Sequence, residues 1–134
     1  MQKLEIQNID HIVMQAANVA ATIAFYTEIL GMIHHEFNPP TGGPVRQSLH
    51  FGSQKINLHD AAAPYVPHAD NPVAGSVDLC FITAQSIADW QAHFAKHNVV
   101  IEVGPVNKTG ANGPLLSLYI RDPDKNLIEI SNYI

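Results

Sequence analysis

The sequence predicts an α+β fold made of two βαβββ modules. Two observations lead to this fold class: each half of the chain orders its strand and helix signals in the same way, and similar segments occupy matching places in the two halves. The chain has 134 residues, of which 46% are hydrophobic and 14% charged, a composition typical of an ordered globular protein. We expect one domain over residues 1–134, with module 1 at about 5–60 and module 2 at about 75–132.

The first module begins with a predicted strand over residues 5–14, where apolar residues alternate irregularly with polar ones. Asn18, a good N-cap residue, then precedes apolar residues at the helical spacing up to Leu30, and Gly31 stands where a helix would stop. Three strands of an antiparallel meander are expected next, separated by turn-forming residues, at 32–37, 46–51 and 55–59.

The second module repeats this order after a connecting segment. Residues 61–75 are rich in Ala, Pro, His and Asp, so no regular element is expected there. A strand over 76–83 is followed by Ser86, which can cap a helix that ends near His97. Three more strands are predicted, at 99–103, 115–120 and 126–130. We interpret residues 106–114 as a flexible polar loop that either closes over a ligand or only connects two strands.

Four segments make the repeat visible. Asp10–Met14 and Val77–Phe81 precede the two predicted helices, and Lys55–His59 and Asn126–Ile130 close the two modules. Sequence identity between the halves is weak, so the order of elements carries the prediction.

Charge and hydropathy exclude two classes of partner. The formal net charge is −5, and no cluster of Lys and Arg offers the positive surface that a nucleic acid needs, so we expect no nucleic-acid partner. No apolar run approaches the roughly 20 residues of a membrane span, and residues 1–9 lack a signal-peptide layout. We therefore expect a cytoplasmic protein without a membrane partner. The single cysteine, Cys80, is expected to be a small buried hydrophobe rather than a nucleophile.

Three segments, in the expected order, resemble the vicinal-oxygen-chelate superfamily, which includes glyoxalases, bleomycin-resistance proteins and extradiol dioxygenases. They are Asp10–Met14, Phe25–Met32 and Arg121–Glu129, the last being an Asp-Pro-Asp turn that leads into an apolar strand with a glutamate. The resemblance covers nearly the whole chain. It implies that the two modules form a curved mixed-sheet cup and that a divalent metal lies inside this cup, held by side chains from the first and last strands of the modules.

The resemblance also assigns candidate metal ligands. His11 matches the ligand of the first strand and Glu129 that of the last, whereas Asp78 stands where the family usually has a histidine. Asn57 stands where a glutamate is often found, and His59, two residues later on the same face of its strand, is a plausible substitute. Imidazole and carboxylate ligands suit Zn, Ni, Co, Mn or Fe(II), and a weakened member of the family could leave the site empty.

Each candidate also has an ordinary structural interpretation. A histidine on an apolar strand is more often a hydrogen-bonded core residue than a ligand, and Asp78 could brace a neighbouring strand. Glu129 is flanked by apolar residues on both sides, so the alternation of its strand does not decide which face it occupies.

The leading functional hypothesis is a metal-dependent lyase or isomerase of the glyoxalase type, acting on a small-molecule substrate. The metal would act as a Lewis acid on adjacent substrate oxygens and steady an enediolate, and Glu129 would move the proton as the catalytic residue. Two alternatives stay open: a metabolite- or drug-binding protein without catalysis, and an Fe(II) extradiol-type dioxygenase that uses His11, His59 and Glu129. The resemblance also implies a homodimer, with sites that two chains can share.

Overall fold

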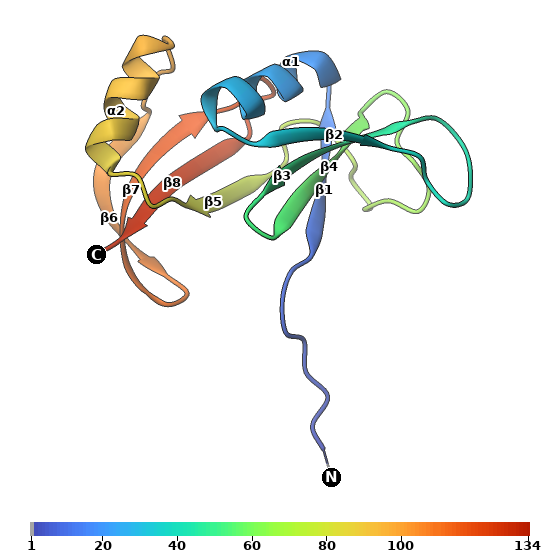
Figure 1. The fold of residues 1–134 in the computed structure, drawn as a ribbon, viewed down its shortest axis with the longest axis horizontal. Helices are drawn as coiled ribbons and strands as arrows, with labels where there is room; N and C mark the ends of the chain where they lie inside the picture. Colours follow the sequence, from blue (N-terminus) through green and yellow to red (C-terminus); the bar gives the residue numbers. More distant parts are fainter. Residues whose placement is uncertain (1) are drawn as a thin grey trace.

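The computed structural model describes residues 2–134, in which eight strands form two four-stranded sheets. Helices and strands follow the predicted order in both modules (Figure 1). The first module comprises β1 (His11–Ala16), α1 (Val19–Ala24), a π-helical turn η1 (Phe25–Ile29), β2 (Ile33–Phe37), β3 (Arg46–Phe51) and β4 (Gln54–Asp60). The second comprises β5 (Asp78–Ile82), α2 (Ile87–Lys96), β6 (Val103–Gly110), β7 (Gly113–Arg121) and β8 (Leu127–Tyr133).

The two sheets share one topology. Their strand orders are β1-β4-β3-β2 and β5-β8-β7-β6, with the first and last strands of each module parallel and the other pairs antiparallel. This mixed pairing confirms the α+β fold of two βαβββ modules. It also puts β1 beside β4, and β5 beside β8, so the strands with candidate ligands are neighbours within each module.

Both helices lie on the same side of the sheets, which fixes where the core is (Figure 1). One cluster of buried apolar residues joins the two modules and includes Tyr26, Leu49, Phe94, Leu118 and Ile128. Because successive residues of a strand point to opposite faces, the intervening residues of each strand face away from the helices. The candidate ligands lie on this opposite face.

Local sequence signals set the helix ends as predicted. The side chain of Asn18 accepts a hydrogen bond from the Ala21 amide at 3.0 Å, and that of Ser86 accepts one from the Asp89 amide at 3.1 Å. Gly31 has φ +71°, a conformation that glycine adopts without steric cost, and it ends the first helical segment. Neither helix within residues 2–134 is long and apolar enough to cross a membrane.

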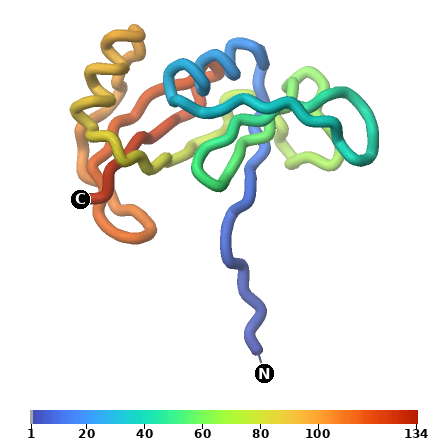
Figure 2. The backbone as a smooth tube through the Cα atoms, viewed as in Figure 1, coloured from blue at the N-terminus to red at the C-terminus, as the bar shows by residue number. Residues whose placement is uncertain are grey.

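The prediction of a strand over residues 5–14 is correct only at its end. β1 begins at His11, and residues 2–10 run as an extended segment away from the body (Figure 2). The register explains this, because β4 pairs with β1 only from His11 onward. Leu4 and Ile6 are left 95% and 93% exposed.

The predictions for residues 99–103 and 106–114 are wrong. Residues 103–110 form β6, an edge strand that pairs with β7, and only Ala111 and Asn112 remain as a turn between the two strands. The polar residues of this stretch suggested a loop, but an edge strand with one exposed face accepts them. The second module therefore has no long loop at this point to close over a ligand.

Candidate functional site

His11 opens β1 on the face of the sheet that points away from the helices. Its Nδ1 lies 2.8 Å from Oδ1 of Asp10, and this hydrogen bond is the main reason why the pKa of Asp10 is lowered. The bond orients the imidazole and leaves Nε2 as the nitrogen that can bind a ligand. His11 also lines a small pocket with Cys80 of β5, so the first strands of the two modules meet here.

Glu129 lies in the middle of β8, half-buried and opposite Cys80 of β5. Ser117 donates a hydrogen bond of 2.7 Å to Oε2 of this carboxylate, and Ser131 donates a longer one of 3.4 Å to the same oxygen. The two serine hydroxyls are 2.6 Å apart. Neutral hydroxyls therefore fix the orientation of Glu129, and among residues 2–134 it forms no salt bridge.

Two further groups near Glu129 have raised pKa values. Burial, followed by a hydrogen bond to Glu129 and its negative charge, raises the pKa of Tyr119 to about 12, so this phenol stays protonated at neutral pH. Burial is also the largest cause of the raised pKa of Cys80, and the charge of Glu129 adds to it. The site thus holds a fixed carboxylate beside a proton-bearing phenol.

Cys80 is exposed, and the expectation of a buried cysteine is wrong. Leu79 and Phe81, its neighbours on β5, are partly buried against the core. Because side chains alternate along a strand, Cys80 lies on the face of the sheet that points away from the helices, which we call the open face. Its raised pKa disfavours the reactive thiolate at neutral pH.

Asp78 is the first residue of β5 and is exposed. It lies two residues before Cys80, on the same face of the strand, and its partner across the sheet is Leu127. Asp78 and Glu129 thus share one face of the second module, offset by two positions along the strands.

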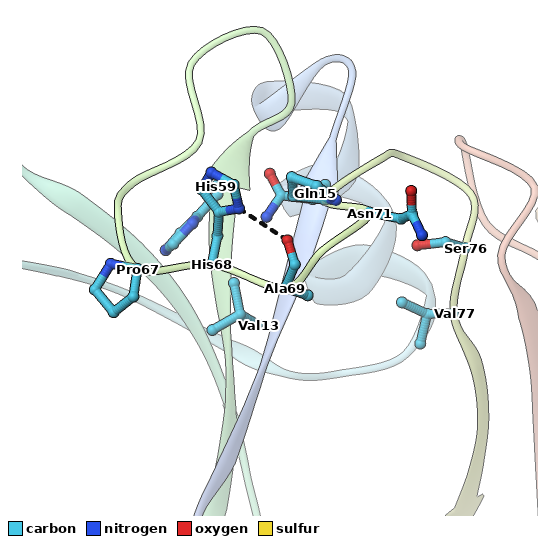
Figure 3. A pocket seen from close by; sticks show the side chains of 10 residues that line it. Val13, Gln15, His59, Pro67, His68, Ala69, Asn71, Ser76 and Val77 are labelled. Atoms are coloured by element: carbon cyan, nitrogen blue, oxygen red, sulfur yellow. Dashed lines mark hydrogen bonds between the residues drawn. The ribbon is translucent and has the colours of Figure 1, made fainter.

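His59 occupies a different part of the molecule. It is opposite Gln15 in the β1–β4 pair and is only 6% exposed. Both side chains line a cavity of about 360 Å³ that is roofed by residues 61–77, the linker between the modules (Figure 3). We call this space the linker cavity. Burial is the main cause of the lowered pKa of His59.

The structure does not bring the four predicted ligands together within one chain. His11 pairs with Lys55 and lies four positions before the Gln15–His59 pair, a separation of about 13 Å along the strands. Among residues 2–134, no three His, Cys, Asp or Glu side chains lie close enough to hold a metal ion. His11 belongs to the open face near β5, Glu129 and Asp78 to the face of the second sheet, and His59 to the linker cavity.

Sequence reasoning missed the neighbours of the candidate residues. Ser117, Tyr119 and Ser131 surround Glu129, and Gln15 stands beside His59. Strand alternation carried part of the signal, because Ser131 lies two residues after Glu129 and Gln15 lies four after His11. The register between strands, which the sequence does not give, was needed for the rest.

Comparison with known proteins identifies the family to which the chain is similar. Residues 8–130 match the model of the Glyoxalase/Bleomycin resistance protein/Dioxygenase superfamily. The match spans both modules and includes His11, His59, Asp78 and Glu129.

Two relatives are similar over nearly the whole chain. "Glyoxalase domain-containing protein RDO1" of Mycosarcoma maydis is 47% identical, over 98% of this chain and 72% of that protein. "Virulence protein STM3117" of Salmonella typhimurium is 46% identical, over 96% of this chain and 86% of that protein. The crystal structure of the Salmonella protein superposes with a TM-score of 0.88 at 44% identity, and covers 98% of this chain and 100% of that one.

A more distant structure shares only the fold. "Lactoylglutathione lyase from Agrobacterium tumefaciens" superposes with a TM-score of 0.67 at 22% identity, over 96% of this chain and 95% of that one.

Proposed function

We propose that this chain, which belongs to the Glyoxalase/Bleomycin resistance protein/Dioxygenase superfamily, is a glyoxalase-type lyase or isomerase that acts on a small oxygen-bearing molecule. One observation carries the proposal: the half-buried carboxylate of Glu129 is held by two serine hydroxyls and has no salt-bridge partner in the described part of the chain. A carboxylate in such a setting is available either to a cation or to a proton.

The residues around Glu129 suit a proton transfer. In an isomerisation the substrate loses a proton from a carbon next to a carbonyl and regains one on the neighbouring atom, so a single carboxylate can remove and return it. Ser117 holds Oε2 at 2.7 Å and thereby orients the carboxylate toward the open face. Tyr119, whose raised pKa keeps its proton in place, forms a hydrogen bond to Glu129 and helps to position the carboxylate.

Within residues 2–134 of one chain, no three candidate ligands lie close enough to hold the metal expected for this family. We therefore propose that a second copy completes the site, with His11 of one copy facing Asp78 and Glu129 of the other. The hydrogen bond between His11 and Asp10 supports this role, since a histidine that binds a metal commonly donates its other ring N–H to a carboxylate. A bound divalent metal would act as a Lewis acid on the substrate oxygens.

The extended N-terminal segment supports a homodimer. Leu4, Ile6 and Ile9 are exposed. Their segment, residues 2–10, extends from the end of β1 that carries His11 (Figure 1). Exposed apolar side chains in a row are stabilised when another surface covers them. A second copy that covers this segment would also lie close to His11, as a shared site requires.

The proton-transfer proposal is tested by hydrogen exchange. Wild-type protein is incubated in D₂O with small 2-oxo aldehydes and their thiol adducts, after loading with Zn, Ni, Co, Mn or Fe(II), and loss of the C–H signal is followed by NMR. We expect Glu129→Gln to slow exchange by roughly 10² to 10⁴, the usual contribution of a general base. Glu28→Gln, an exposed carboxylate on η1, is the matched control and should exchange at the wild-type rate.

Two outcomes would contradict the proposal. Exchange at the wild-type rate in Glu129→Gln would remove Glu129 from the reaction. No exchange by the wild-type protein with any metal would move the assignment to the binding-protein alternative, a carrier of a metabolite or drug without catalysis. The linker cavity, with its volume of about 360 Å³, is the observation that favours this second candidate.

The dioxygenase alternative fits less well. It needs two histidines and one carboxylate on the same iron. His11 and His59 line different pockets, one beside β5 and the other beneath the linker, so they do not provide that set within a chain.

A further inference from the structure

The linker cavity contains polar side chains that have no role in the proposed reaction. Gln15 and His59 are 7% and 6% exposed, and both line the cavity (Figure 3). Within residues 2–134, Gln15 Oε1 and His59 Nδ1 are buried without a hydrogen-bond partner. A buried polar atom without a hydrogen-bond partner destabilises the folded state, so the protein retains two unfavourable groups opposite each other in the β1–β4 pair. Such groups are expected where a ligand provides the missing partner.

A cationic side chain, Arg46, contacts the same tyrosine as His59 and lies outside the ten residues that line the cavity. The guanidinium of Arg46 lies 4.2 Å from the ring centroid of Tyr65, and the ring of His59 lies 4.8 Å from the ring of the same tyrosine. Arg46 Nε is also buried without a partner in the described chain. His68, a second imidazole, lines the same cavity.

The other residues that line the cavity indicate the charge and the size of the ligand that it can hold. None of the ten lining residues, all within residues 2–134, is acidic. The nearest carboxylate in sequence, Asp60, accepts a hydrogen bond from the Ala62 amide at 2.9 Å and follows His59 on the other face of the strand. Val13 and Val77 add apolar walls. A volume of about 360 Å³ is at the lower end for small-molecule sites.

We propose that the linker cavity binds a small hydroxycarboxylate, with the carboxylate toward His59, on the side of the Arg46–Tyr65 contact, and the hydroxyl toward Gln15. The unpaired Nδ1 of His59 and the nearby charge of Arg46 suit a carboxylate, which only accepts hydrogen bonds. The amide of Gln15 offers an unpaired oxygen, and a hydroxyl is the group that can donate to it. This ligand site does not depend on the proposed reaction at Glu129, because binding can be measured without turnover.

Three probes with one carbon skeleton separate the contributions. Lactate carries both groups, propionate lacks the hydroxyl, and lactamide lacks the charge. Binding is followed by NMR from the methyl signals of Val13 and Val77, which line the cavity, with Val100, 79% exposed elsewhere, as the reference. We expect lactate to bind, propionate to bind about tenfold more weakly, as for one lost hydrogen bond, and lactamide not to bind.

Variants then locate the two groups. Gln15→Leu should weaken lactate to the level of propionate and leave propionate unchanged, whereas Arg46→Gln should weaken both. Gln91→Leu, on α2, is the control and should bind all probes as the wild type does. Because Gln15→Leu removes a buried unpaired group, it should fold with undiminished stability.

The proposal is overturned by three results. One is the absence of any shift of the Val13 and Val77 methyl signals with about 10 mM lactate, a concentration that fills most of a site whose Kd is about 1 mM. Another is equal binding of lactate and lactamide. The third is a Gln15→Leu protein that still prefers lactate over propionate.

Discussion

Tyr26 joins the two modules through one buried hydrogen bond, and Tyr26→Phe removes it while keeping the ring. The hydroxyl donates to Oδ2 of Asp122 at 2.7 Å, in the turn that leads to β8 and Glu129. Tyr26 is fully buried, and burial together with the charge of Asp122 raises its pKa, so the phenol keeps its proton. Asp122 retains the Asn126 side chain as a second donor to the same oxygen at 2.8 Å.

The expected loss follows from this geometry. A hydrogen bond to a charged acceptor contributes about 1.5–3 kcal/mol, and the remaining donors on Asp122 favour a value of about 2 kcal/mol. For a domain of this size, that loss lowers Tm by about 6 to 10 °C. Urea unfolding followed by circular dichroism measures the loss in the free energy of unfolding. Tyr133→Phe is the control, since Tyr133 is 43% exposed. Equal stability of the two variants would refute the role of Tyr26 in joining the modules.

Three further predictions concern single positions. Gly75→Ala should destabilise the protein by about 1–3 kcal/mol more than Gly52→Ala in thermal unfolding. Both glycines have positive φ, but of the two only Gly75 would place a Cβ against a backbone oxygen, 2.6 Å from Asp124 O. Equal losses of stability in the two variants would contradict this close approach. His59 has a folded-state pKa below its ordinary 6.5, so the unfolded state binds more protons, and stability is lost as pH falls below about 6.5. Urea midpoints from pH 7 to 5 should decline less steeply in His59→Leu than in the wild type, and parallel curves would count against a buried neutral imidazole. The exposed thiol of Cys80 should react slowly with a disulfide reagent at pH 8, because its pKa is raised. Glu129→Gln should speed the reaction, because the negative charge of Glu129 is one cause of that raised pKa. An unchanged rate would contradict the interaction between Cys80 and Glu129.

Much of the fold could be predicted from the sequence because its signals are local. Asn18, Ser86 and Gly31 set helix ends through their own side chains or backbone, and the structure has them in these positions. The strand over residues 5–10 and the loop over 106–114 were wrong for the opposite reason. Whether an extended segment becomes a strand depends on a neighbour to pair with, which lies far away in the sequence.

The candidate site shows the same division. The strand motifs located His11 and Glu129 on the first and last strands, as the structure has them. They did not reveal that His59 lies four positions along the sheet from His11, beneath the linker, because parallel register is a long-range property. Ser117 became visible as a partner of Glu129 only through the pairing of β7 with β8.

We propose that the metal site is shared between two copies, with His11 from one chain and Glu129 from the other. The most direct measurement is the metal content of a mixture of His11→Ala and Glu129→Gln proteins, unfolded together and refolded. If each site takes one residue from each chain, half of the random dimers are mixed, and each has one intact site of two, so about one quarter of the wild-type metal content should return. Each variant refolded alone should bind none. A mixture that binds no more metal than the separate variants, although the wild type binds it, would contradict the shared site.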